Sequence, residues 1–165
     1  MRRLHLWREL RRAPLALFSF AFLALVILVA ATYPLWYPVS PLAQDLLGSL
    51  QPPLAETRTG THLLGTDQLG RDLLARVLLG ARISLIVGGV ALLISIVFGS
   101  LAGLLAGYFG GWVDAVITGV TETVMALPFI VLAIAVIGAL GSSTTVVILT
   151  LGLSSWVGYA KLVRA

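Results

Sequence analysis

Two long stretches without a charged side chain constrain what this chain can fold into. Residues 14–36 form the first stretch, and no charged residue occurs between Arg82 and Asp114. A helix of about 20 apolar residues crosses the hydrocarbon core of a bilayer. Charged residues make up only 11% of the 165 residues, against about 25% in soluble domains. The sequence therefore predicts an all-α, multi-pass transmembrane bundle.

The apolar pattern predicts four membrane spans, at residues 14–36, about 83–108, about 113–140 and about 146–162. The charges beyond them indicate the orientation, because basic residues stay on the cytoplasmic side. The ends of the chain hold Arg2, Arg3, Arg8, Arg11, Arg12, Lys161 and Arg164. In residues 37–82, the basic Arg58, Arg71, Arg76 and Arg82 are balanced by Asp45, Glu56, Asp67 and Asp72. We therefore expect both ends in the cytoplasm and residues 37–82 outside.

The first span has a competing interpretation, which is a cleaved signal peptide. A basic leader precedes it, and Ala30 and Ala31 provide small residues near its end. The uncharged stretch is longer than the roughly 7 to 15 residues of a signal-peptide core. A retained span is therefore favoured, and cleavage stays the alternative.

The external segment divides into two parts at His62. Residues 37–61 are rich in Pro, Gln, Ser and Thr, which is typical of irregular structure. From Asp67 to about Leu79, apolar residues recur at helical spacing, and Gly80 is a natural stop. We expect an amphipathic helix within residues 62–82 that lies on the outer membrane surface or over neighbouring spans.

Polar residues around the start of this helix predict its cap and its ion pairs. Thr66 or Asp67 can cap the first turn, because a short side chain there accepts a backbone N–H. Asp67 with Arg71, and Asp72 with Arg76, are acidic-before-basic pairs at the favourable four-residue spacing.

The second span carries a row of small residues at four-residue spacing. A face of this kind lets another helix approach closely, which matters where lipid removes the hydrophobic drive for association. The row predicts tight packing without identifying the partner helix. Its members are Ala91, Ser95, Gly99, Gly103 and Gly107.

The third span contains two unusual residues, Glu122 and Pro128. A carboxylate at membrane depth faces a protein interior or an aqueous cavity, which makes Glu122 a candidate pathway residue. Equally, Glu122 lies near the cytoplasmic end, where it can reach water or a basic partner. Pro128 predicts a kink, because proline removes one helical hydrogen bond.

Candidate chemistry elsewhere is sparse. His62, Asp67 and Asp72 lack the spacing of a metal-ligand set, and helix capping and ion pairing account for both aspartates. Ser154 and Ser155 have no partner base for nucleophilic chemistry. The sequence holds no cysteine and no Walker-type loop, and no basic and aromatic run suggests nucleic-acid binding. We expect a protein without enzymatic activity, cofactor or metal.

Residues 62–72 (HLLGTDQLGRD) and 80–85 (GARISL) closely resemble the C-type permease subunits of bacterial dipeptide, oligopeptide and nickel ABC importers. Residues 106–114 (AGYFGGWVD), Pro128 and residues 158–165 (GYAKLVRA) match the same family. The family has Asp six residues before that proline, and Glu122 keeps the charge. In the external motif, the resemblance singles out Gly65, Thr66, Asp67, Gly70, Arg71 and Asp72.

The resemblance implies a type I ABC importer permease fold in the bacterial inner membrane, here incomplete. It implies six spans, a coupling loop with an EAA-type motif after Ala165, and ATP bound only by partner subunits. Those partners are a second permease subunit, two ATPase subunits and an extracytoplasmic substrate-binding protein. The expected organisation is residues 1–61 as N-terminal segment, first span and external loop, 62–82 as external helix, and 83–165 as the start of the permease domain.

Three functions remain open from the sequence. The first is a permease that moves short peptides, or a related solute such as chelated nickel, by alternating access. The second is a non-transporting N-terminal fragment or remnant, because the sequence stops before the coupling loop. The third, an ion channel or proton relay around Glu122, has thin support because no second ionisable group accompanies that residue along the path.

Overall fold

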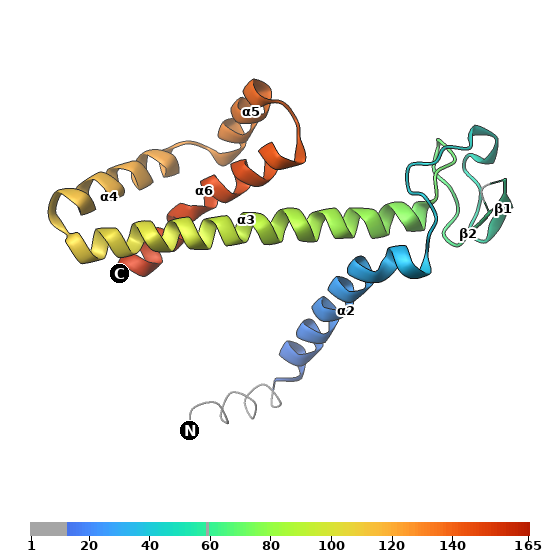
Figure 1. Cartoon of the computed structure of the whole chain (residues 1–165), viewed down its shortest axis with the longest axis horizontal. Helices are drawn as coiled ribbons and strands as arrows, with labels where there is room; N and C mark the ends of the chain where they lie inside the picture. The colour runs from blue at the N-terminus through green and yellow to red at the C-terminus, as the bar shows by residue number, and fades with distance from the viewer. Residues whose placement is uncertain (1–12, 59) are drawn as a thin grey trace. The chain divides into compact units, whose positions relative to one another are not determined.

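The computed structural model describes residues 13–58 and 60–165, and Figure 1 shows that most of them are helical. The chain divides into two compact units. The first unit is Met1–Leu85 and the second is Ile86–Ala165. The N-terminal basic cluster, Arg2 to Arg12, lies outside the described residues, so its predicted cytoplasmic side stays a prediction.

The first helix, α2, runs from Pro14 to Trp36 and covers the first predicted span. Proline suits the first helical turn, where its missing N–H would have no partner in any case. Most side chains of α2 are exposed, including Leu15, Phe18 and Leu28. Because they are apolar, lipid is the medium that suits them.

The segment after α2 is more ordered than its composition predicts. A 3₁₀ turn, η1, covers Leu46–Gly48, and its first turn is capped by Asp45, whose Oδ1 accepts from the Leu47 amide at 3.2 Å. Strands β1 (Ala55–Thr57) and β2 (Gly60–His62) form an antiparallel hairpin in which Ala55 pairs with His62. The expectation of irregular structure over residues 37–61 is therefore wrong for these elements, which rest on pairings that composition does not reveal.

The predicted external helix is also wrong at both of its ends. Helix α3 begins at Leu73 and continues through Gly80 to Phe109. Residues 67–72 form a turn instead, because Gly70 adopts a φ of +70°, which a helix cannot accommodate. Asp72 caps the new start: its Oδ1 accepts from the Ala75 amide at 2.6 Å. The helix does not end at Gly80, because the apolar residues on both sides of this glycine continue it.

The second unit contains the remainder of α3 and three further helices, α4 (Gly111–Ala126), α5 (Phe129–Leu140) and α6 (Thr144–Arg164). The turn predicted between the second and third spans is present, with positive φ of 59° at Gly110 and 52° at Gly111. The polar break before α6 is shorter than residues 141–145, because Ser143 caps that helix through the Val146 amide.

Pro128 does more than kink the third predicted span. Helices α4 and α5 are separate and meet at a bend of 89°. Leu127 is extended, with φ −89° and ψ 126°, as expected of a residue that precedes proline. The prediction of one kinked helix is therefore wrong, since the helix stops before Pro128 and restarts after it.

Three described helices, α2, α3 and α6, are long and apolar enough to cross a membrane. The bent pair α4 and α5 provides a fourth crossing if it is one broken span, and otherwise forms a re-entrant loop. By length and composition, the described residues therefore hold three or four spans, which is compatible with the predicted four.

Candidate functional sites

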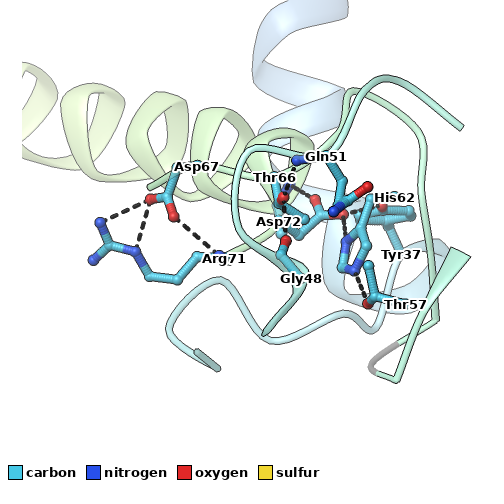
Figure 2. Close-up of polar contacts among 10 residues, drawn as sticks. Tyr37, Gly48, Gln51, Thr57, His62, Thr66, Asp67, Arg71 and Asp72 are labelled. Carbon is cyan, nitrogen blue, oxygen red and sulfur yellow. Dashed lines mark hydrogen bonds and ion pairs between the residues drawn. The ribbon is translucent and has the colours of Figure 1, made fainter. Parts of the chain in front are cut away.

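A buried carboxylate, that of Asp72, is the centre of a polar network in the first unit (Figure 2). Its side chain is only 1% exposed. Oδ2 accepts from the Tyr37 hydroxyl at 2.9 Å and lies 2.7 Å from Nδ1 of His62. Oδ1 accepts from the Ala75 amide. A buried carboxylate is costly unless hydrogen bonds compensate it, and here both oxygens have partners.

His62 extends this network into the hairpin. The ring is 2% exposed, and its Nε2 lies 2.8 Å from Oγ1 of Thr57 on the neighbouring strand. One carboxylate thus connects the end of α2 through Tyr37, the hairpin through His62, and the start of α3 through Ala75. Burial, then the hydrogen bond and charge of Asp72, raises the pKa of Tyr37 to about 12, so the phenol stays a donor at neutral pH.

Thr66 closes the loop that precedes the motif. Its hydroxyl donates to the Gly48 carbonyl at 2.5 Å and accepts from the Gln51 amide at 2.9 Å. Gly65 beside it has a φ of +80°, and a Cβ atom there would overlap the Gln51 carbonyl oxygen. Gly70 has the same restriction against the carbonyl of Asp45. The two glycines are therefore needed for conformation and for close backbone approach.

Asp67 and Arg71 form the predicted ion pair, at 2.8 Å between Oδ2 and Nη2, but in a turn rather than on a helix. Arg76 also pairs with Asp67, so the predicted pairing of Arg76 with Asp72 is wrong. Burial raises the pKa of Asp67, but hydrogen bonds from the Arg71 backbone and side chain and from the Leu69 amide outweigh it. The pKa therefore lies well below its usual range, and the carboxylate is charged.

The small residues of α3 lie against α6 in the second unit. Oγ of Ser95, 1% exposed, is 2.9 Å from the carbonyl oxygen of Gly152 and 2.9 Å from that of Ala91 in its own helix. A Cβ atom on Gly99 would overlap the Trp156 carbonyl oxygen. The backbones of the two helices therefore approach too closely for larger side chains.

The same row continues toward the end of α3. A Cβ atom on Gly103 would lie 2.5 Å from the Ala160 carbonyl oxygen, and one on Gly107 would lie 3.6 Å from that of Arg164, an ordinary contact. The packing is thus tightest at the middle of the row and ordinary at Gly107. Phe98 adds an edge-to-face contact with Trp156, with the ring centroids 5.5 Å apart.

Glu122 is exposed on α4 and lines a cavity of about 510 Å³ together with Thr118, Lys161, Arg164 and Ala165. The carboxylate thus shares its surroundings with basic side chains of α6, which the sequence had left open. Pro128 lies at the break between α4 and α5, six residues further along the chain.

From the sequence, the motif at residues 62–72 was recognised as a unit, and His62 on its own was considered only as a metal ligand. Tyr37 and Thr57 were missed, since neither belongs to a local pattern that points to Asp72. Among the residues that the structure describes, no group of three acidic, histidine or cysteine side chains is arranged to hold a metal ion.

Comparison with known families gives matches to two segments of the chain. Residues 95–165 match the family described as binding-protein-dependent transport system inner membrane component. Residues 5–53 match the N-terminal TM domain of oligopeptide transport permease C. These are families of transport permeases and not of enzymes, which confirms the expectation that the chain is not an enzyme.

Individual relatives agree with this assignment. The chain is 35% identical over 158 residues to a dipeptide transport system permease protein of Bacillus subtilis, covering 96% of this chain and 48% of the relative. It is 36% identical over 160 residues to a glutathione transport system permease protein of Pectobacterium atrosepticum, covering 96% of this chain and 51% of the relative. It is 38% identical over 143 residues to the nickel transport system permease protein of Escherichia coli K12, covering 87% and 50%.

The chain spans about half the length of the curated relatives that it matches. The alignment with the Bacillus subtilis protein covers 96% of this chain, and the family model that matches residues 95–165 includes the part of α3 that carries Ser95, Gly99 and Gly103 and the whole of α6. The comparisons therefore confirm the resemblance of this chain to the inner membrane components of binding-protein-dependent transport systems, among them the C-type permeases for dipeptides, oligopeptides and nickel.

Proposed function

We propose that this chain is part of a permease subunit of an ABC importer that moves short peptides, or a related solute such as chelated nickel, across the bacterial inner membrane. The observation that carries the proposal is the match of nearly the whole chain to dipeptide, glutathione and nickel permeases at 35 to 38% identity. The transport mechanism would be alternating access driven by ATP.

The proposed partners are a second permease subunit, two ATPase subunits that bind ATP, and an extracytoplasmic substrate-binding protein. The proposed orientation places the N-terminus in the cytoplasm, on the basis of the arginines before α2 and the neutral balance of residues 37–82. In this orientation the first unit's polar network lies outside, on the side from which an importer receives its substrate.

Uptake by cells tests the transport proposal directly. The full-length protein would be expressed with its partner subunits in a strain without its own dipeptide and nickel permeases. We expect accumulation of radiolabelled dialanine or of labelled nickel, with loss of accumulation when the ATPase subunits are omitted. Accumulation of neither solute, in cells where the assembled complex is present, would contradict the proposal.

We further propose that the motif at residues 65–72 holds the external segment rigid where the substrate-binding protein docks. Arg71 supports this role, since its backbone and side chain both donate to Asp67. Arg71→Asp should impair docking and uptake, whereas the matched change Arg58→Asp, in the hairpin turn, should have a smaller effect. Normal uptake, complex assembly and docking in Arg71→Asp would show that the motif has no such role.

A further inference from the structure

The last turn of α6 and one face of α4 carry charged residues that lie near each other. Asp114, Thr118 and Glu122 are spaced four residues apart and therefore share one face of α4. Lys161 and Arg164, three residues apart, share a face of α6. Thr118, Glu122 and the two basic residues line the cavity of about 510 Å³, which lies wholly within the second unit.

Arg164 of α6 and Asp114 of α4 form an ion pair with two contacts. Nε of Arg164 lies 2.6 Å from Oδ1 of Asp114, and Nη2 donates to Oδ2 at 2.7 Å. Two parallel contacts of this kind are the preferred geometry between a guanidinium and a carboxylate. Arg164 is therefore committed to Asp114, although it borders the cavity.

Glu122 and Lys161 are the next pair of charges on these two helix faces. Neither forms an ion pair within the described part of the chain. The two side chains nevertheless border the same cavity, with the hydroxyl-bearing Thr118 beside them. Both belong to apolar helices, where an ionisable group faces an aqueous cavity or an oppositely charged partner.

The geometry points to a binding site for a zwitterion in this cavity. Its ammonium group would contact the Glu122 carboxylate, and its anionic group would contact the Lys161 ammonium. A simple cation would contact only the Glu122 carboxylate and a simple anion only the Lys161 ammonium, so either would leave the second charge without a ligand group. A molecule with both charges compensates the two walls together.

This chemistry has two sources, a short peptide with free termini and the phosphoethanolamine headgroup of a membrane lipid. Each presents a primary ammonium and an anionic oxygen group on one small molecule. The peptide source rests on the proposed transport function, whereas the lipid source is independent of it.

The chain contains no cysteine, so Thr118→Cys would place a single thiol at the cavity. The experiment follows its reaction rate with a small neutral maleimide, in the full-length protein assembled with its partner subunits in nanodiscs. In phosphatidylglycerol discs we expect dialanine to slow labelling several-fold. N-acetyl-dialanine and dialanine amide, which each lack one charge, should leave the rate unchanged. For the lipid source, discs that contain phosphatidylethanolamine should slow labelling without added peptide.

Variants of Glu122 and Lys161, the two charged residues of the cavity that are proposed to bind the zwitterion, supply the controls. Glu122→Gln and Lys161→Met, each combined with Thr118→Cys, should abolish protection, and the exchange of both charges (Glu122→Lys with Lys161→Glu) should restore part of it. A thiol at Ser142, in the loop before α6, should react at the same rate under all conditions.

Equal protection by the blocked peptides, or no protection by peptide or by lipid, would overturn the assignment. Because labelling does not require transport, this result is separate from any failure of the uptake experiment. If dialanine slows labelling and the variants behave as expected, but cells show no uptake, the zwitterion site is retained and the proposed import function is contradicted.

Discussion

The polar network around Asp72 in the first unit and the α3–α6 pair of the second unit hold segments together by different chemistry. In the first unit, the Asp72 carboxylate accepts hydrogen bonds from the Tyr37 hydroxyl and the Ala75 amide and contacts the His62 ring, so it joins residues from three parts of the chain. In the second unit, backbones approach each other at glycines, and Ser95 provides one hydrogen bond between the helices.

The difference follows from the surroundings of each region. Outside the membrane, water competes for every polar group, so a network is secure only when it is buried and fully partnered. Within lipid, apolar side chains gain little by leaving lipid for protein, and close packing of small residues supplies the attraction instead. The first region should therefore be sensitive to the loss of a charge, and the second to an increase in volume.

The largest effect is expected at Asp72. Asp72→Ala leaves the Tyr37 hydroxyl, the His62 ring and the Ala75 amide without their acceptor, and should lower the free energy of unfolding by about 3 to 5 kcal/mol. Denaturant unfolding of the purified full-length protein measures this. Asp72→Asn keeps one acceptor oxygen and should lose less. A change below about 0.5 kcal/mol, the range of ordinary surface substitutions, in the alanine variant would mean that the network does not stabilise the unit.

The corresponding change in the second unit is Gly99→Ala. Its methyl group would overlap the Trp156 carbonyl oxygen, and overpacking of this kind costs about 1 to 3 kcal/mol. Gly88→Ala is the matched control on the same helix, because a Cβ atom there has nothing within 4 Å. Equal thermal stability of the two variants would contradict the close approach of α3 and α6.

The two regions should also differ in their response to acid. The lowered pKa of Asp67 means that the unfolded chain takes up a proton first as the pH falls. The stabilisation is therefore complete above the ordinary carboxyl range and is lost below roughly pH 4, by at most about 1.4 kcal/mol per pH unit. Between pH 6 and pH 2.5, the free energy of unfolding should decline less steeply in Asp67→Asn than in the wild type. Parallel curves for the two proteins would be evidence against this contribution of Asp67.

The smallest effect is expected from the single polar contact between α3 and α6. Ser95→Ala removes the hydrogen bond to the Gly152 carbonyl while it preserves the small volume, and should cost about 0.6 kcal/mol, the average for such bonds in membrane proteins. Ser100→Ala, on the same helix, is the control. If Ser95→Ala exceeds Gly99→Ala in its effect, polarity rather than volume controls this helix pair.

Hydropathy was enough to predict the first and the last span closely, but not where α3 begins or that the third span breaks at Pro128. Helix α2 has the predicted bounds, Pro14 and Trp36, and α6 begins and ends two residues outside the predicted 146–162. The length of an uncharged stretch can be read directly from the sequence, and the thickness of the membrane determines how long a span must be. Local spacing was less informative at residues 67–72, because a four-residue interval between Asp67 and Arg71 fits a turn as well as a helix. The positive φ of Gly70 decides between them.

The partners of the candidate sites could not be predicted from one sequence. Tyr37 lies 35 residues before Asp72, and Thr57 reaches His62 only through the register of a hairpin. Likewise, the small residues of α3 indicated a packing face, but nothing in their spacing pointed to Gly152 and Trp156 of α6. Long-range pairing depends on the fold, whereas the motif and the packing face are local.

The most direct test of the central proposal is ATP-dependent accumulation of labelled dialanine or nickel in proteoliposomes that contain the full-length permease with its partner subunits and binding protein. The account predicts accumulation with ATP supplied to the ATPase side. It also predicts strong reduction in Asp72→Ala and Gly99→Ala, and near-normal accumulation in Gly88→Ala. Accumulation that is absent in the wild type, or that does not depend on ATP, would contradict it.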